Sequence, residues 1–294
     1  MPDASAVVVT YNALPWIEQS LASVREVETV VVDNGSTDGT VDVVRELFPD
    51  VTLIEQENRG LAAGWNVGMA AASGRYFLIL NADAWMTEGS LARLVEFADS
   101  RPDAAVIGPR LLNTDGTLQR SVRGVPTLWR LATEYFFLRK LAPGSRLLNA
   151  FYAGGFDHDQ VRDVEVVMGA CMLVRRAAVD QVGGLDEAFF LFSEETDWCR
   201  RFTDAGWTVV FFPGAECVHV GAASHGGRMF RENVRGHLRF LAKHRGPAYA
   251  ERARRLLRLA LRLRGRLFHD ERGRMYREAA EWLGSGRVPE LLER

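Results

Sequence analysis

The stretch Arg75-Tyr-Phe-Leu-Ile-Leu-Asn-Ala-Asp-Ala-Trp85 joins an apolar run to an amide and a carboxylate. Tyr76 to Leu80 are too few for a helix, but such a run is typical of a strand covered on both faces of a parallel α/β sheet. Alternation along an extended segment would point Asn81 and Asp83 the same way. Because open α/β sheets bind ligands at the carboxyl ends of their strands, we expect chemistry here. A simple polar turn is the alternative interpretation.

Strands and helices alternate around this stretch. Hydrophobic periodicity predicts a mostly parallel sheet flanked by helices, with right-handed crossovers, and a helical tail beyond Gly246-Pro247. The expected strands are 6–10, 29–32, 51–55, 76–80, 104–108, 164–174 and 208–212, and the expected helices are 15–24, 40–48, 61–72, 88–100, 126–141, 175–182, 194–205, 229–243 and 250–268.

Composition is that of an ordinary globular protein, with 47% hydrophobic and 25% charged residues in 294. The three cysteines, Cys171, Cys199 and Cys217, are too scattered for a disulfide framework or a zinc site, which favours a reducing, cytoplasmic setting. We expect no signal peptide, and no apolar stretch approaches the roughly 20 residues needed to span a bilayer. Any membrane association would therefore be peripheral.

Charge is distributed unevenly along the chain. The net charge is −2, yet Glu251 is the only acidic residue in the arginine-rich segment 251–268, so the rest of the chain is acidic. An acidic body argues against nucleic-acid binding. The tail could be a basic amphipathic helix on an anionic membrane, at the inner face of the plasma membrane. The alternative is a helix packed on the core or in a homodimer interface through 247–268.

Two carboxylates follow predicted strands. Asp33 comes after the second strand and Asp83 after the fourth, where acidic side chains could hold a nucleotide and a divalent cation. Capping of a turn by Asp33 remains an alternative, because Ser36, Thr37 and Asp38 are close in sequence. No glycine-rich phosphate loop with a lysine follows the first strand, which disfavours a P-loop or dinucleotide-binding protein.

An acidic cluster opens a predicted helix. Glu194, Glu195 and Asp197 are close enough for mutual repulsion to raise the pKa of at least one of them, which would suit a general base. Acidic residues also stabilise a helix N-terminus without any catalytic role. His219 ends a predicted strand and could be either a ligand or a structural histidine.

Taken together, the motifs of this chain resemble glycosyltransferase family 2, in its rhamnosyltransferase-like branch. The resemblance covers about residues 5 to 245, in the family's order and spacing. It rests on Val7-Val-Val-Thr-Tyr-Asn12, Val31-Val-Asp-Asn-Gly-Ser-Thr-Asp-Gly-Thr40, Asn58-Arg-Gly60, Gly64-Trp-Asn-Val-Gly68, Leu80-Asn-Ala-Asp83, Leu118-Gln-Arg-Ser121, Met168-Gly-Ala-Cys-Met-Leu-Val-Arg-Arg176 and Glu194-Glu-Thr-Asp-Trp-Cys-Arg200.

The resemblance implies a GT-A fold and an inverting sugar transfer that needs Mg²⁺ or Mn²⁺. The donor would be a dTDP- or UDP-sugar, most simply dTDP-rhamnose, and the acceptor a glycan or lipid-linked saccharide in cell-surface polysaccharide synthesis. Residues 1–246 would form the GT-A domain, with a donor half at 1–110 and an acceptor half at 111–246, and 247–294 a helical tail.

Roles carry over by position. Glu195 aligns with the catalytic carboxylate, with Glu194 as the alternative. Asp83 would bind the metal, and His219 resembles a histidine that completes the metal site in some members. The implied substrate-binding residues are Thr10, Tyr11, Asn12, Asp33, Asn58, Arg59, Asn66, Asn81, Asp83 and Trp198.

Asn81 departs from the family pattern, which has an Asp there. A neutral amide adds no negative charge beside a diphosphate, and a weaker acceptor fits a deoxythymidine donor, which lacks the ribose 2′-hydroxyl. Two other readings remain. A nucleotidyltransferase would need the missing phosphate loop, and a non-catalytic nucleotide-sugar binding protein would have no use for the acidic cluster at 194–197.

Overall fold

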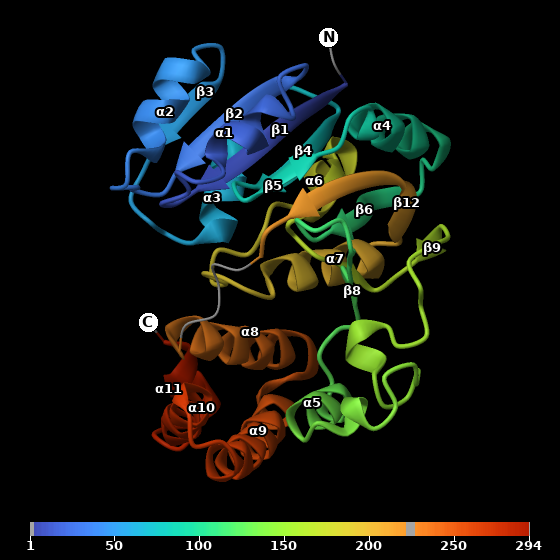
Figure 1. Cartoon of the computed structure of the whole chain (residues 1–294). Helices are drawn as coiled ribbons and strands as arrows, with labels where there is room; N and C mark the ends of the chain where they lie inside the picture. Colours follow the sequence, from blue (N-terminus) through green and yellow to red (C-terminus); the bar gives the residue numbers. More distant parts are fainter. Residues whose placement is uncertain (1–2, 222–226, 294) are drawn as a thin grey trace. The chain divides into compact units, whose positions relative to one another are not determined.

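Four parallel strands form one half of the central sheet, as the alternation of strands and helices predicted. The structure is a computed structural model that describes residues 3–221 and 227–293. The strands β1 (Ala4–Thr10), β2 (Glu28–Asp33), β3 (Thr52–Glu55) and β4 (Tyr76–Asn81) pair in the order β3-β2-β1-β4 (Figure 1). They are connected by α1 (Ile17–Ala22), α2 (Thr40–Leu47) and α3 (Leu61–Ala71).

The other half of this 10-stranded sheet is mixed. Strand β11 (Cys171–Arg175) lies antiparallel between β4 and β6 (Ala104–Leu112), and β12 (Thr208–His219) runs parallel to β6. The antiparallel additions are β5 (Ala84–Met86) and β9 (Arg162–Asp163) on β12, and β7 (Leu118–Gln119) on β6. A separate pair consists of β8 (Val122–Arg123) and β10 (Val166–Val167), and the helices of this half are α4 (Ser90–Ser100), α6 (Arg176–Val182) and α7 (Glu194–Asp204).

Three elements differ from the sequence-based expectation. The strand expected at 164–174 is broken between β10 and β11, where a Cβ on Gly169 would lie 3.0 Å from the Trp65 ring and 3.5 Å from Glu195 Cβ. The helix expected at 126–141 is α5 (Leu128–Tyr135), which ends before Phe137 enters the left-handed region at φ 60°. Strand β12 extends to His219 through an irregularity between Phe212 and Glu216.

Helix α3 packs very close to β1 because its facing residues are glycines. A Cβ on Gly64 would lie 2.8 Å from Val9 Cγ1, and one on Gly68 would lie 2.4 Å from Val7 Cγ1. Real Cβ atoms do not approach other atoms this closely, so these two positions require glycine. The close packing fixes the beginning of α3 next to the carboxyl end of β1.

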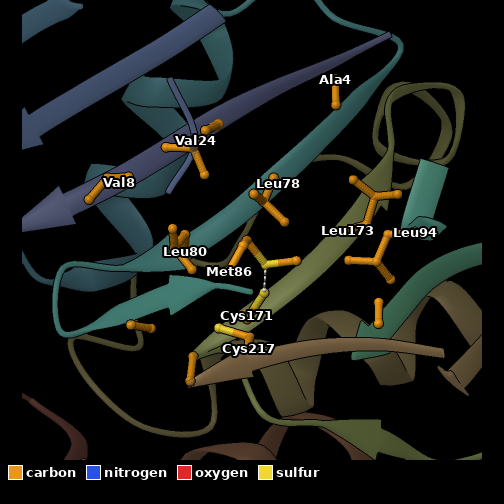
Figure 2. Packing of buried hydrophobic residues seen from close by; sticks show 14 of the residues in the cluster. Ala4, Val8, Val24, Leu78, Leu80, Met86, Leu94, Cys171, Leu173 and Cys217 are labelled. Atoms are coloured by element: carbon orange, nitrogen blue, oxygen red, sulfur yellow. Dashed lines mark hydrogen bonds between the residues drawn. The ribbon is translucent and has the colours of Figure 1, made fainter. Parts of the chain in front are cut away.

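The side chains of β1 and β4 on the sheet face away from α3 form a large apolar core. Ala4, Ala6 and Val8 pack with residues of β4, β11, α1, α2 and α4, including Leu78, Leu173, Leu21, Val44 and Leu94 (Figure 2). Cys171 and Cys217 lie in the same core, with the Cys171 thiol 3.4 Å from the Met86 sulfur. All three cysteines are buried and free.

The chain forms two compact units. One contains the sheet and comprises the described residues up to Val122, Asp157–Phe190 and Glu194–Gly221, whereas the other contains Arg123–Phe156, Leu191–Ser193 and the described residues beyond Gly221. This second, helical unit groups 123–156 and α8 with the tail. Its elements are α5, η1 (Leu138–Lys140), η2 (Ala150–Tyr152), α8 (Gly227–Arg245), α9 (Pro247–Leu267), α10 (Glu271–Trp282) and α11 (Val288–Leu292).

Helix α9 packs within the helical unit. Ala253, Leu257 and Leu261 are fully buried on one face, as the amphipathic pattern predicted. Arg264 also turns inward: its guanidinium lies 3.8 Å from the Phe137 ring centroid and donates a hydrogen bond to the Tyr135 carbonyl at 2.7 Å. Within the described part of the chain, no helix combines the length and apolar character that crossing a bilayer requires.

Candidate functional site

The sheet brings several of the expected site residues to one edge. Thr10 pairs with Asp33 in the register of β1 and β2, and Val9 pairs with Asn81 in the register of β1 and β4. All three strands run in parallel, so Thr10, Asp33 and Asn81 end on the same edge. The expectation that these residues lie together therefore agrees with the observed register.

Several residues of the quoted motifs carry a buried polar atom without a hydrogen-bond partner. Among the described residues, the Thr10 hydroxyl oxygen, Asn81 Oδ1, Trp65 Nε1 and Glu194 Oε2 are buried and have no hydrogen-bond partner. Buried polar atoms in native proteins are nearly always satisfied, so each such atom needs an explanation. A polar ligand that forms hydrogen bonds with these atoms would explain them.

The loop after β2 is held together by Asp33. The Asp33 carboxylate is buried and accepts hydrogen bonds from the backbone N–H groups of Gly35 at 2.9 Å and Ser36 at 2.8 Å. Asn12 fastens the same loop, because its Oδ1 accepts from the N–H of Thr37 at 2.8 Å. These contacts are those of the turn-capping alternative, and recognition of a base by Asp33 stays a prediction. Tyr11 beside this loop is 55% exposed.

Helix α3 begins at a polar network that sequence reasoning only half anticipated. Arg59 forms an ion pair with Glu187 at 2.8 Å, and Asn66 donates hydrogen bonds to Glu187 at 3.1 Å and to the Leu185 carbonyl at 2.9 Å. Asn58 Oδ1 accepts from the N–H of Gly60 at 3.1 Å. No sequence pattern indicates Glu187 as their partner, because its position depends on how the loop before α7 folds back onto α3.

Asp83 lies in a turn and not on the strand. Strand β4 ends at Asn81, and Ala82 and Asp83 form the turn into β5, so side-chain alternation does not extend to Asp83. Pairing of β5 with the end of β12 brings Asp83 Oδ1 to 3.5 Å from His219 Nε2. The other carboxylate oxygen accepts from the N–H of Gly221 at 3.2 Å. The two expected metal residues thus face each other.

The electrostatics of this pair suit a cation. Burial acts to raise the pKa of Asp83, but the hydrogen bond and charge of His219 and the Gly221 N–H outweigh burial, so its pKa lies below the ordinary value. A carboxylate oxygen and an imidazole nitrogen 3.5 Å apart can share one ion, because each metal bond is about 2.0–2.2 Å long. No group of three His, Cys, Asp or Glu side chains with metal-binding geometry occurs in the described residues, so a bound ion would take its other ligands from substrate and water.

The acidic cluster separates into three environments at the start of α7. Glu194 is only 3% exposed, and burial, with the nearby Glu195 charge, raises its pKa well above the ordinary value. Asp197 is instead paired with Arg201 at 2.8 Å. Glu195 is half-buried and lies beside Gly169, so it is the better placed of the two glutamates to meet a substrate. Repulsion between neighbouring carboxylates was expected, and Glu194 shows its effect.

Trp198 occupies the core. Its side chain is 1% exposed, and its indole N–H donates to the Gly183 carbonyl at 2.9 Å. Packing alone accounts for this residue, and its contact with substrate stays a prediction. Trp65, in contrast, was not expected in the site: its ring borders Gly169 and its indole nitrogen is buried without a partner in the described residues. A Trp inside an Ala- and Gly-rich helix was the available signal.

The fold is the GT-A fold. A mannosyltransferase from Pyrobaculum calidifontis, solved with GDP-Man and Mn²⁺, matches 98% of this chain and 82% of its own with a TM-score of 0.57 at 18% identity. S. aureus TarS matches 91% of this chain and 44% of its own with a TM-score of 0.54 at 16% identity. At such identities these likenesses concern the fold alone.

The family follows from the sequence comparisons. The model of Glycosyl transferase family 2 matches residues 5–183, and the chain belongs to this family. An N-acetylglucosaminyl-diphospho-decaprenol L-rhamnosyltransferase of Mycobacterium tuberculosis is 32% identical over 244 residues, covering 75% of this chain and 76% of the relative. The low-salt glycan biosynthesis hexosyltransferase Agl10 of Haloferax volcanii is 26% identical over 68% of this chain and 62% of its own. The expected resemblance to the rhamnosyltransferase-like branch is confirmed.

Proposed function

We propose that this enzyme transfers L-rhamnose from dTDP-L-rhamnose to a sugar on a polyprenyl diphosphate, with inversion at the anomeric carbon. The mycobacterial relative, whose name states an N-acetylglucosaminyl-diphospho-decaprenol acceptor, supports the sugar and the acceptor class. The observation that carries the catalytic part is the Asp83–His219 pair, 3.5 Å apart at the carboxyl edge of the sheet. The setting would be the cytoplasmic synthesis of cell-surface polysaccharide.

Asp83 and His219 are the residues that would hold the divalent cation. When bound, the cation offsets negative charge on the leaving nucleoside diphosphate. An imidazole nitrogen is a softer ligand than the oxygens that Mg²⁺ prefers, which favours Mn²⁺. Asn81 is neutral and adds no negative charge beside the diphosphate. Its unpartnered buried Oδ1 is available to accept a hydrogen bond from the nucleotide-sugar.

Glu195 would be the general base. It would take the proton of the acceptor hydroxyl as that oxygen forms a bond to the anomeric carbon, while the bond from this carbon to the diphosphate oxygen breaks. Burial raises the pKa of Glu194 and so favours its neutral form, and the Asp197 carboxylate is paired with Arg201. When Glu194 is neutral, Glu195 can carry its negative charge without the repulsion that two ionised carboxylates would create.

The donor would lie along the strand ends. Thr10, Tyr11, Asn12 and Asp33 would border the nucleotide, and Arg59 would approach the diphosphate. Arg59 is already paired with Glu187, with 61% of its side chain exposed, so it could exchange this partner for a phosphate. Asn58 and Asn66 hold the surrounding loop, as their hydrogen bonds to Gly60 and Leu185 indicate.

Calorimetric titration of the purified full chain with dTDP-, UDP- and GDP-sugars in Mn²⁺, followed by a transfer assay, tests this function. We expect dTDP-rhamnose to bind most tightly and its sugar to appear on polyprenyl-diphospho-N-acetylglucosamine. Tight binding without turnover on any acceptor would instead support a non-catalytic nucleotide-sugar binding protein. Formation of a nucleotide-sugar from a nucleoside triphosphate and a sugar phosphate would support a nucleotidyltransferase.

A lipid-linked acceptor makes peripheral membrane contact a useful property, and one face of α9 suits it. This face, formed by Arg252, Arg255, Leu259, Arg262, Leu263, Arg266 and Leu267, is exposed. Leu259 is 55% and Leu267 is 69% exposed, so two large apolar side chains of this face are in contact with solvent. Arginines that meet anionic headgroups beside leucines that enter the acyl boundary are typical of interfacial helices.

Liposome flotation of the full chain tests the membrane contact. Truncation at Gly246 is unsuitable because α9 supplies Leu257 and Leu261 to the core of the helical unit. We expect a Leu259→Ser, Leu263→Ser and Leu267→Ser triple variant to lose flotation with vesicles containing phosphatidylglycerol. Equal flotation of the two proteins would remove the proposal, and a concentration-dependent dimer lost in the triple variant would favour the homodimer interface.

A further inference from the structure

Gln119 is held beside the metal-binding pair by a short antiparallel connection. Strand β7 places Gln119 opposite Leu111 of β6, next to the end of β12, where His219 lies. The turn between the two strands is closed by a hydrogen bond from the Asn113 N–H to the Thr117 carbonyl at 2.8 Å. The sheet thus fixes the backbone of Gln119 relative to His219.

The orientation of the Gln119 amide follows from its partners. Its Nε2 donates to the His219 backbone carbonyl at 3.1 Å and to Asn113 Oδ1 at 3.0 Å. A carbonyl oxygen can only accept, so the amide nitrogen must face it. The amide oxygen therefore faces His219 Nδ1 at 2.7 Å, and this ring nitrogen must carry the proton.

The same direction of donation continues away from the site. Asn113 Nδ2 lies 2.9 Å from Thr117 Oγ1, and the Thr117 hydroxyl donates to Asp115 Oδ1 at 2.6 Å. The hydrogen bonds from the Thr117 side chain and backbone lower the pKa of Asp115, so its carboxylate is ionised at neutral pH and can only accept. Donors and acceptors are thus assigned for every hydrogen bond in the series that links Asp115, Thr117, Asn113, Gln119 and His219.

We propose that Gln119 is a positioning residue: by accepting from His219 Nδ1–H it selects the Nδ1–H tautomer of the neutral imidazole, the form whose Nε2 lone pair is available to a cation held by Asp83. The protonated imidazole instead donates from Nε2 to the Asp83 carboxylate. The inference rests on the proposed role of Asp83 and His219 as cation ligands. A histidine that ligates through one nitrogen commonly donates its other N–H to a fixed acceptor, which sets the tautomer and ring orientation. Here that acceptor is an amide, so the His219 ring gains orientation without an additional negative charge.

The tautomer is measurable in the metal-free protein. Two-bond ¹⁵N–¹H correlation spectra of the ¹⁵N-histidine-labelled full chain at alkaline pH distinguish Nδ1–H from Nε2–H imidazole, and a His219→Asn variant identifies the His219 signals. We expect Nδ1–H in the wild type, a shift toward Nε2–H in Gln119→Leu, and retention of Nδ1–H in Gln119→Glu, which keeps an acceptor. Gln181→Leu, which removes an exposed glutamine bonded to Trp207, should leave these signals unchanged.

Titration with Mn²⁺ gives a second measurement. We expect Gln119→Leu to weaken Mn²⁺ binding about 10- to 100-fold. An Nε2–H tautomer in the wild type, or the same tautomer and Mn²⁺ affinity in the wild type and Gln119→Leu, would overturn the proposal. If the wild type shows Nδ1–H, lost in Gln119→Leu, but binds no Mn²⁺, then the positioning of His219 stands and the proposed metal site fails.

Discussion

The two glutamates at the start of α7 differ in a way that their sequence order conceals. Glu194 is buried with a raised pKa, whereas Glu195 is half-buried beside Gly169. A neutral carboxyl group closely resembles an amide in shape, so Glu194→Gln should change turnover little. Glu195→Gln removes the proton acceptor and should lower kcat on the order of 10² to 10⁴. Transfer rates of the two variants, with donor affinity measured alongside, check this prediction. Equal losses in both would contradict it.

A second prediction concerns substitution of Asp83. Asp83→Asn keeps the shape and the acceptor for the Gly221 N–H but removes the charge that would hold a cation. We expect Mn²⁺ affinity and donor affinity to fall together, and excess chelator to abolish wild-type transfer. Asp50→Asn serves as the matched control, because Asp50 is an exposed turn carboxylate outside this hydrogen-bond network. Unchanged Mn²⁺ binding in Asp83→Asn would refute the role of Asp83.

At the level of residues, the sequence predicted a set of site residues but not the contacts that the structure shows between them. Asn81 and Asp83 were expected to share one side of an extended segment, whereas a turn after Asn81 directs Asp83 to β12. His219 and Asp83 are far apart in sequence, and only the pairing of β5 with β12 brings them together. The contacts of Gln119, although it lies in a quoted motif, and of Glu187 were not predicted for the same reason, because their partners come from distant segments.

Among the elements, the close packing of α3 on β1 depends on glycine at particular positions. A Cβ on Gly68 would lie 2.4 Å from Val7 Cγ1 and 3.3 Å from Val32 Cγ2. We expect Gly68→Ala to lower the free energy of unfolding by about 1–3 kcal/mol, although alanine is the better helix former. Denaturant unfolding of Gly68→Ala, Val7→Ala and the double variant measures this. The double variant should be more stable than the sum of the single losses allows, since Val7→Ala makes room. Strict additivity would argue against the close packing.

Element boundaries were predictable where one pattern dominated. The β-branched runs of β1 and β2, the apolar run of β4 and the glycine-rich α3 were expected within a few residues of their observed bounds. The apolar run 164–174 gave no warning of its interruption, because hydrophobicity does not reveal that Gly169 must pass next to Trp65 and Glu195. Similarly, the apolar residues after Tyr135 continue a helical pattern that the left-handed Phe137 ends.

At the scale of the molecule, a buried histidine should make stability depend on pH. His237 in the helical unit lies among aromatic rings, 6.4 Å from that of Tyr135 and 5.6 Å from that of Phe151, and burial lowers its pKa to about 4. In the unfolded chain His237 has its ordinary pKa of 6.5, so protonation favours the unfolded state. The contribution of His237 to the free energy of unfolding is therefore fully present above pH 6.5 and declines as the pH falls toward 4. The decline from this group should be on the order of 3 kcal/mol.

Hydrogen exchange of α8 amides at pH 7.5 and pH 4.5, in wild type and His237→Leu, isolates this contribution. We expect the wild type to lose more protection than the variant on acidification. Glu194 acts with the opposite sign, because its raised pKa weakens the fold as pH rises, but it is present in both proteins and cancels. Parallel pH profiles would contradict the assignment to His237.

The α/β class followed from the alternation of strands and helices, and the strand register places Thr10, Asp33 and Asn81 on one edge of the sheet. The division into a sheet unit and a helical unit did not. Its second unit is built from segments on both sides of α7, and no local pattern shows that 123–156 and α9 share a core. That information lies in contacts such as Arg264 with the Tyr135 carbonyl.

The central claim is that Asp83, His219 and Glu195 form one inverting glycosyl-transfer site. Its most direct test is NMR of the product formed from dTDP-L-rhamnose and polyprenyl-diphospho-N-acetylglucosamine by wild type and Glu195→Gln in Mn²⁺. We predict a rhamnoside with the anomeric configuration opposite to that of the donor, formed by the wild type and almost absent with Glu195→Gln, which still binds the donor. A product with retained configuration, or undiminished transfer by Glu195→Gln, would contradict the account.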